Sequence, residues 1–258
     1  MENHLQKLVN ILSQKFSTSL IVENKKSDIN FKFQTPLQLD PNFNYELALV
    51  YFSTYNSIFN VTNKNNKIII KIITNQKTIP IELPPGAYEI NEISSIIGNI
   101  LKVDKTLIPL KDKEFYIIIK PNPISLNCIM QISKNCEVQF PKENSLANML
   151  GFETEKIYSE GNHSSKSVAI SNINRIMIEC NIVEGAFYNG EKTNIIFDFP
   201  SNTVRKGSRI IERPKFPIYY PLITKKINEI NFKIIDNKGE LIDFNEEEIS
   251  FTIHLKQV

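Results

Sequence analysis

The chain has 258 residues, of which 41% are hydrophobic and 22% are charged, and these values exclude wholesale disorder. Thirty Lys and Arg against 28 Asp and Glu give a net charge of +2 without any block of like charge, so we expect no sequence-specific nucleic acid binding. No apolar run is long enough for a membrane-spanning helix. The N-terminal sequence lacks the features of a signal peptide, so we expect an intracellular protein that is not secreted by that route.

The N-terminal segment has the pattern of a short amphipathic helix. Leu5, Leu8 and Leu12 recur at a spacing of three to four residues, with polar side chains between them. We therefore expect residues 1–26 to form an N-terminal helix or arm. Packing on its own domain is the default expectation, and contact with a neighbouring subunit is the alternative.

Most of the remaining chain predicts strands. In 29–33 apolar and polar residues alternate, which is typical of a half-buried strand, whereas 45–55 is apolar on both faces and predicts a buried central strand. The other predicted strands cover 67–73, 115–120, 175–183, 194–199, 217–223, 230–236 and 248–256. The last of these alternates most regularly and places His254 on its polar face. The stretch 230–244 predicts a hairpin whose turn is 236–239, with Gly239 suited to a positive φ.

Two helices interrupt the strands. Isoleucines between 90 and 101 recur at helical spacing, and 143–152 predicts a second helix that ends at Gly151 in the left-handed conformation. The segment 159–167 is the most polar of the chain and predicts a long exposed loop, which is also a possible domain boundary. Ten or more strands with few helices favour an all-β sandwich over a parallel α/β fold.

Residues with catalytic or metal-binding chemistry are sparse. Cys128, Cys136 and Cys180 have no paired spacing, the three histidines are far apart, and no phosphate-binding glycine loop, nucleophile elbow or HExxH motif occurs. We interpret the acidic run 246–248 as a charged turn and the basic residues between 205 and 213 as a solvated loop. The sequence therefore predicts no cofactor, no metal site and no enzymatic activity.

Five segments resemble a known family. They are LPPGAYEINEI (83–93), ENSLANMLGF (143–152), NINRIMIECNIVEGAFYNGEK (172–192), GSRIIERPKFPIYYPLI (207–223) and the stretch 227–256. In this order and spacing they are similar to the minor capsid, or penton, proteins of Polinton (Maverick) elements and the related adintoviruses. The similarity covers most of residues 80–256 and is weaker before residue 80.

This resemblance implies a jelly-roll β-sandwich with short helical insertions, here over residues 27–258. It implies a virion protein that forms the five-fold vertices of an icosahedral capsid as a homopentamer, beside a double jelly-roll major capsid protein. Candidate subunit contacts are Phe216, Tyr219 and Tyr220 in a proline-rich segment, because tyrosine and phenylalanine are favoured at interfaces, together with the N-terminal leucines. Tyr219 and Tyr220 could equally pack within one subunit.

Two other functions stay open at this point. The chain could be a jelly-roll module that binds a carbohydrate or a peptide without any capsid role, although the lack of Trp counts against stacking on sugars. It could also be an enzyme built on a β-sandwich, against which the scarcity of histidine and of paired nucleophile and base residues argues.

Overall fold

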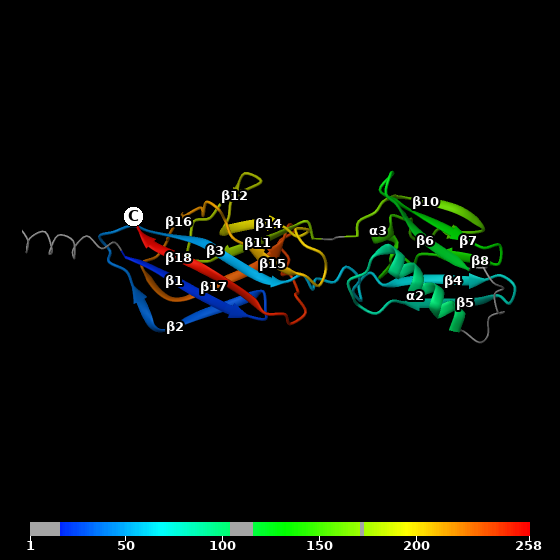
Figure 1. Cartoon of the computed structure of the whole chain (residues 1–258), viewed down its shortest axis with the longest axis horizontal. Coiled ribbons are helices and arrows are strands. Elements are labelled where there is room, and N and C mark those ends of the chain that lie inside the picture. Colours follow the sequence, from blue (N-terminus) through cyan, green and yellow to red (C-terminus); the bar gives the residue numbers. More distant parts are fainter. Residues whose placement is uncertain (1–15, 104–115, 171–172) are drawn as a thin grey trace, which may run out of the picture. The chain divides into compact units, whose positions relative to one another are not determined.

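A computed structural model describes residues 16–103, 116–170 and 173–258 of the chain. The chain divides into two compact units, each with a hydrophobic core of its own (Figure 1). Unit 1 combines Met1–Ile58 with Ile173–Val258, and unit 2 is the segment Phe59–Asn172 between them. Unit 2 is therefore an insertion into the chain of unit 1.

Unit 1 contains a five-stranded sheet, a four-stranded sheet and a small hairpin. Sheet A has the order β1 (Ser17–Asn24), β18 (Ile249–Gln257), β3 (Tyr45–Tyr55) and β15 (Arg209–Glu212), and β16 (Tyr220–Pro221) also pairs with β3. Sheet B has the order β14 (Ile195–Pro200), β11 (Arg175–Cys180), β17 (Lys226–Asp236) and β2 (Asp28–Gln38). The hairpin consists of β12 (Phe187–Tyr188) and β13 (Glu191–Lys192).

The connectivity of the two sheets is that of a jelly roll. When the eight main strands are counted along the chain, sheet A holds the first, eighth, third and sixth, and sheet B holds the fifth, fourth, seventh and second. All of these pairings are antiparallel. The double Greek key that the resemblance implies is thus present, and unit 2 is inserted between the third and fourth strands.

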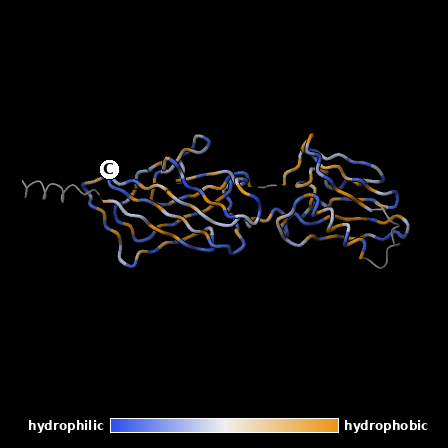
Figure 2. Tube along the Cα trace, viewed as in Figure 1, coloured by the Kyte–Doolittle hydropathy of each residue, from blue (hydrophilic) through white to orange (hydrophobic). Residues whose placement is uncertain are grey.

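The core of unit 1 lies between sheets A and B. Phe251 of β18 meets Phe232 of β17 with ring centroids 4.9 Å apart, and Phe52 of β3 meets Phe199 of β14 at 5.2 Å. Hydrophobic and hydrophilic residues alternate along the strands (Figure 2). The prediction for the last strand is confirmed, because its four large apolar side chains at 249, 251, 253 and 255 are all buried.

Unit 2 is also built of antiparallel strands. One sheet has the order β5 (Lys77–Glu82), β4 (Lys67–Ile72), β8 (Cys136–Gln139) and β9 (Ile157–Tyr158), and the other has the order β10 (Gly161–Ser167), β7 (Asn127–Ile132) and β6 (Ile117–Asn122). Helix α2 (Ile90–Val103) buries Ile93 and Ile97 in the core of this unit, and the short helix α3 is Ala147–Leu150. Among the described residues, no helix has both the length and the apolarity to span a membrane.

Several elements differ from their expected bounds. The division at 58/59 and 172/173 does not follow the expected single domain over 27–258 or the possible boundary at 159–167. Ser17–Asn24 were expected in the N-terminal arm but form β1, which pairs along its full length with β18. The expected loop at 159–167 is largely β10, whose polar side chains flank backbone pairing with β7.

The helix expected over 143–152 is reduced to α3. Asn144 has a φ of 52°, and Lys67 forms a bridge to Ser145, so the chain is held outside the helix up to Ser145, and α3 begins at Ala147. Gly151 takes the left-handed conformation as expected, with a φ of 78°. An added Cβ there would lie 2.5 Å from the carbonyl oxygen of Lys166, so the position requires glycine for two reasons.

Candidate interaction surface

The proline-rich segment 213–220 connects β15 to β16 and contains three of the predicted interface residues. Phe216 is 88% exposed and lies between Pro214 and Pro217. Ile218 is 66% exposed in the same segment. Two large apolar side chains therefore face solvent on a short segment whose two prolines restrict its backbone.

Tyr219 is held by contacts within unit 1. Its hydroxyl shares a hydrogen bond of 2.7 Å with Nδ1 of His254, and Nε2 of the same imidazole shares one of 2.8 Å with Ser17 Oγ. The Lys256 ammonium lies 3.6 Å from the centroid of the Tyr219 ring. His254 is on the polar face of β18 as predicted, and it connects the first strand, the last strand and the proline-rich segment.

Tyr220 is half-buried against the core of unit 1 and is therefore mainly a packing residue. Burial raises the pKa of its hydroxyl, and the negative charge of Asp198 raises it further. Of the three aromatic residues predicted at an interface, the structure leaves Phe216 exposed and engages the other two within the subunit. The remaining candidates, Leu5, Leu8 and Leu12, lie outside the described residues.

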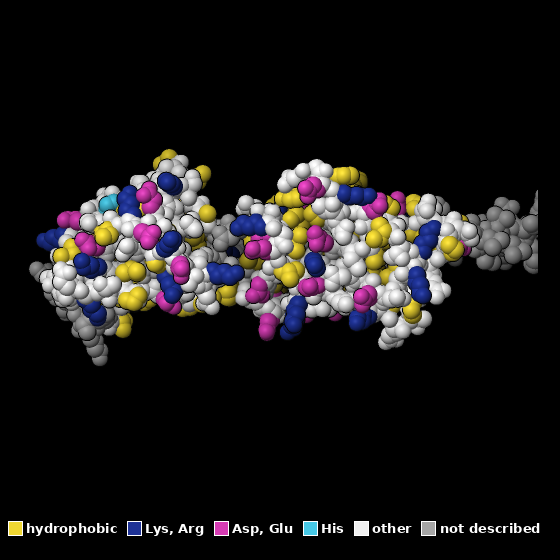
Figure 3. Space-filling view, turned by 180° about the vertical axis from the view of Figure 1, so that it is seen from behind, with side chains coloured by type: hydrophobic (Ala, Val, Ile, Leu, Met, Phe, Trp, Pro, Cys, Tyr) yellow, Lys and Arg dark blue, Asp and Glu magenta, His cyan; other side chains and the backbone are white. Residues whose placement is uncertain are grey.

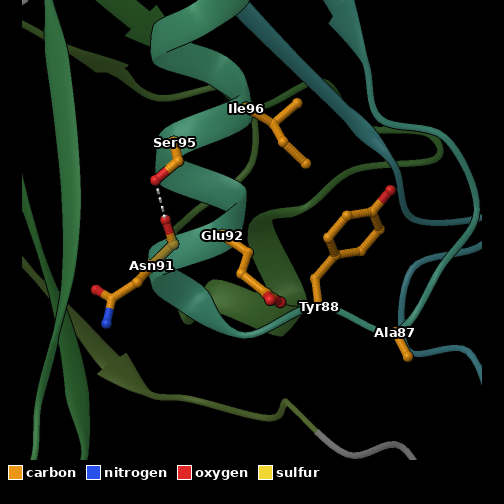
Figure 4. Close-up of a pocket in the computed structure, with 6 residues that line it drawn as sticks. All are labelled: Ala87, Tyr88, Asn91, Glu92, Ser95 and Ile96. Atoms are coloured by element: carbon orange, nitrogen blue, oxygen red, sulfur yellow. Dashed lines mark hydrogen bonds between the residues drawn. The ribbon is translucent and has the colours of Figure 1, made fainter. Parts of the chain in front are cut away.

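An open groove of about 460 Å³ lies in unit 2, beside the first half of α2 (Figure 4). The ring of Tyr88 and the side chain of Ile96 face it. Its polar groups are engaged locally: the backbone N–H of Glu89 donates to Glu92 Oε2, Ser95 Oγ donates to the Asn91 carbonyl, and the Tyr88 hydroxyl donates to the Pro84 carbonyl. The groove thus combines one aromatic ring with an apolar wall.

A second, smaller cavity of about 120 Å³ lies on the outward face of sheet B in unit 1. Its apolar lining comes from β11, β14 and the β12–β13 hairpin: Met177, Ile195, Ala186, Phe187 and Tyr188. Arg175 and Asp198 also line it and form an ion pair at 2.5 Å. Sequence reasoning missed this cavity, although Met177 and Ile195 are apolar residues of these strands that lie outside the main core and could have indicated a covered outer face.

The three cysteines are buried and free. Burial raises the pKa of Cys128 to about 11 and that of Cys180 to about 12, and it also raises the pKa of Cys136. Cys180 thus packs as a small buried apolar residue in the core of unit 1. Within the described ranges, no three side chains of His, Cys, Asp or Glu come close enough together to hold a metal ion.

Charged side chains of both signs are interspersed on the face that Figure 3 shows. Two arginines of the predicted basic loop contact aromatic rings of β3 instead of standing free in solvent. The guanidinium carbon of Arg209 lies 5.7 Å from the Tyr55 ring centroid, and that of Arg213 lies 5.1 Å from the Tyr51 ring centroid. Arg209 Nε also donates to Ser53 Oγ. These residues stabilise the edge of sheet A.

No protein-family model and no curated protein matches the chain. Among solved structures, the chain is similar to the mavirus penton protein, with a TM-score of 0.48 and 13% identity over 95% of this chain and 100% of that chain. It is also similar to a chain in the cryo-EM structure of the Sputnik virophage, with a TM-score of 0.43 and 11% identity over 93% and 97% of the two chains.

Proposed function

We propose that the chain is a penton, a minor capsid protein that forms the five-fold vertices of an icosahedral capsid in the virion. The strand order of the two sheets in unit 1 carries this proposal, because it is the jelly-roll order that the sequence resemblance implies. The five resembling segments include strands of both sheets and helices of unit 2, so they extend across both units. The role is structural and not enzymatic.

In this function the partners are further copies of the chain and a double jelly-roll major capsid protein. Five copies around one axis make head-to-tail contacts that close into a ring. Such contacts typically bury roughly 800 Å² on each partner, so they need exposed apolar side chains. The proline-rich segment supplies two of these, Phe216 and Ile218.

The solution mass of the purified protein tests the proposal. Five chains of 29.7 kDa form a ring of about 149 kDa, and light scattering over a range of protein and salt concentration should detect this species without larger polymers. A stable dimer or trimer would contradict the five-fold assignment. A chain that stays monomeric, also when it is co-expressed with a double jelly-roll capsid protein, would contradict the capsomer role.

A further inference from the structure

Phe216 has the properties of an anchor residue for a protein interface. It is among the most exposed large apolar side chains of the described residues, at 88%, and a proline lies on its N-terminal side at 214 and directly after it at 217. Aromatic side chains that fill a pocket on a partner contribute much of the binding free energy at many interfaces. Prolines reduce the conformational freedom that such a segment loses on binding.

Both ends of the segment are fixed to the outward face of sheet A. Near one end, Arg213 lies over the ring of Tyr51 at 5.1 Å. Near the other end, Tyr219 is bonded to His254 and covered by Lys256. Phe216 is therefore presented from a segment that is already ordered in the free subunit, which lowers the entropic cost of binding.

A cavity of matching size lies on the opposite face of the same unit. The 120 Å³ cavity is on the outward face of sheet B, because Met177 in its lining points away from the core that the neighbouring residues Ile176 and Ile178 enter. For comparison, an apolar cavity of about 150 Å³ in another protein binds benzene. The volume of the cavity is thus close to, and slightly below, that of a site for one aromatic ring.

The charges around the two features are complementary. Arg213 and Lys215 flank Phe216, and the segment 213–220 has no acidic residue. Two charged residues line the cavity, Arg175 and Asp198, and they form an ion pair. On the hairpin, Lys192 forms an ion pair with Glu184, and the neighbouring Glu191 is exposed and lies directly opposite Tyr188 in the hairpin register. The basic anchor segment can therefore place Lys215 near the exposed carboxylate of Glu191.

We propose that Phe216 of one copy inserts into the cavity between sheet B and the β12–β13 hairpin of the next copy. The proposal rests on the penton function and specifies its subunit contact. Since the anchor and the cavity are on opposite faces of one sandwich, the contact is heterologous, and it gives a closed ring when the rotation from each copy to the next returns to the first copy after five steps. Lys215 of the first copy then lies near Glu191 of the second.

Disulfide trapping tests this contact directly. The double variant Lys215→Cys with Glu191→Cys keeps Phe216, and the three native cysteines are buried. Mild oxidation should then form disulfides between neighbouring copies and give a ladder of covalent oligomers that ends at the pentamer. Each single-cysteine variant can form at most a dimer. The matched control is Ile124→Cys with Glu191→Cys, because Ile124 is 95% exposed on unit 2, and it should give no ladder.

The variant Phe216→Asp adds an independent measurement. It should remain folded by circular dichroism and require an at least roughly 30-fold higher concentration to assemble, the effect of losing one anchor residue. Phe216→Leu should retain most of the assembly, and Ile124→Asp should assemble like the native chain. If the native chain forms pentamers and the Phe216→Asp variant forms them at the same concentration, the proposed contact is overturned and the penton function is not. A native chain that stays monomeric and gives no ladder, also when it is co-expressed with a double jelly-roll capsid protein, would overturn both.

Discussion

Replacement of Phe251 by Ala should loosen unit 1 and leave unit 2 intact. Phe251 is fully buried in sheet A, and its ring packs edge-to-face on Phe232 of sheet B. Removing a buried phenyl ring costs about 3–5 kcal/mol of unfolding free energy. At about 1.4 kcal/mol per factor of ten, the unfolded population of unit 1 should rise about 140- to 3,700-fold.

Thiol labelling measures this change in each unit separately. Cys180 lies in the core of unit 1, opposite Phe232 in the register of β11 and β17, whereas Cys128 and Cys136 lie in the core of unit 2. Burial raises the pKa of Cys180 to about 12, so at pH 8 the folded unit protects it as a neutral thiol. When opening and closing are fast, the labelling rate follows the population of the open unit.

The expected result is selective. Phe251→Ala should accelerate labelling of Cys180 by the factor above and leave the two thiols of unit 2 unchanged, while Phe251→Leu should have a much smaller effect. Phe140→Ala is the reciprocal control, because Phe140 is fully buried in unit 2 and stacks on Phe152 at 5.2 Å. Equal acceleration of all three thiols would refute the reasoning, since the two cores would then unfold as one.

Three further predictions use the same labelling assay. Gly151→Ala should destabilise unit 2 by more than about 1 kcal/mol, because its φ is positive and the new Cβ would meet the Lys166 carbonyl; protection of Cys128 that does not change would contradict this. Gly98→Ala should stabilise unit 2 by about 0.5–1 kcal/mol, because Gly98 lies inside α2, where alanine has the higher helix propensity, and has open space around it. Faster labelling of Cys128 in this variant would contradict the prediction. Deletion of residues 2–15 keeps β1 whole and should leave unit 1 folded. Deletion of residues 2–20 removes half of β1 and should expose Cys180 to labelling. If Cys180 were labelled at the same rate in both variants, the pairing of β1 with β18 would contribute little to the stability of unit 1.

The strands with a buried face were predictable from the sequence, and the edge strands were not. In β18 every second residue is a large apolar one, so the pattern determines both its conformation and its orientation. β1 is an edge strand of which only Val22 is fully buried, and β10 has no large apolar residue at all. Backbone pairing with a neighbour holds both of them, and hydrophobic periodicity does not report such pairing.

The division into two units could not be predicted for a related reason. The strands of both units are rich in β-branched residues, so no change in composition marks the boundaries at residues 58/59 and 172/173. The candidate surface was predicted in part. The proline-rich segment marked Phe216 as a candidate contact residue, but the strand expected over 217–223 is reduced to β16, Tyr220–Pro221. The cavity that we assign to Phe216 depends on a hairpin that folds back over Met177, which is a tertiary contact between segments without a shared motif.

The insertion of unit 2 also imposes an order on folding during synthesis. β1 and β3 are synthesised early, but both pair with β18, which ends at Gln257. Neither pairing can form before β18 has been synthesised. At about 5–20 residues per second, the last strand follows the third after roughly 10–40 seconds. Unit 2 is complete at Asn172, so its core can form while the apolar strand β3 still lacks its neighbours. The nascent chain therefore exposes an 11-residue apolar strand on the N-terminal side of a folded unit, which makes β3 the segment where a chaperone is most needed.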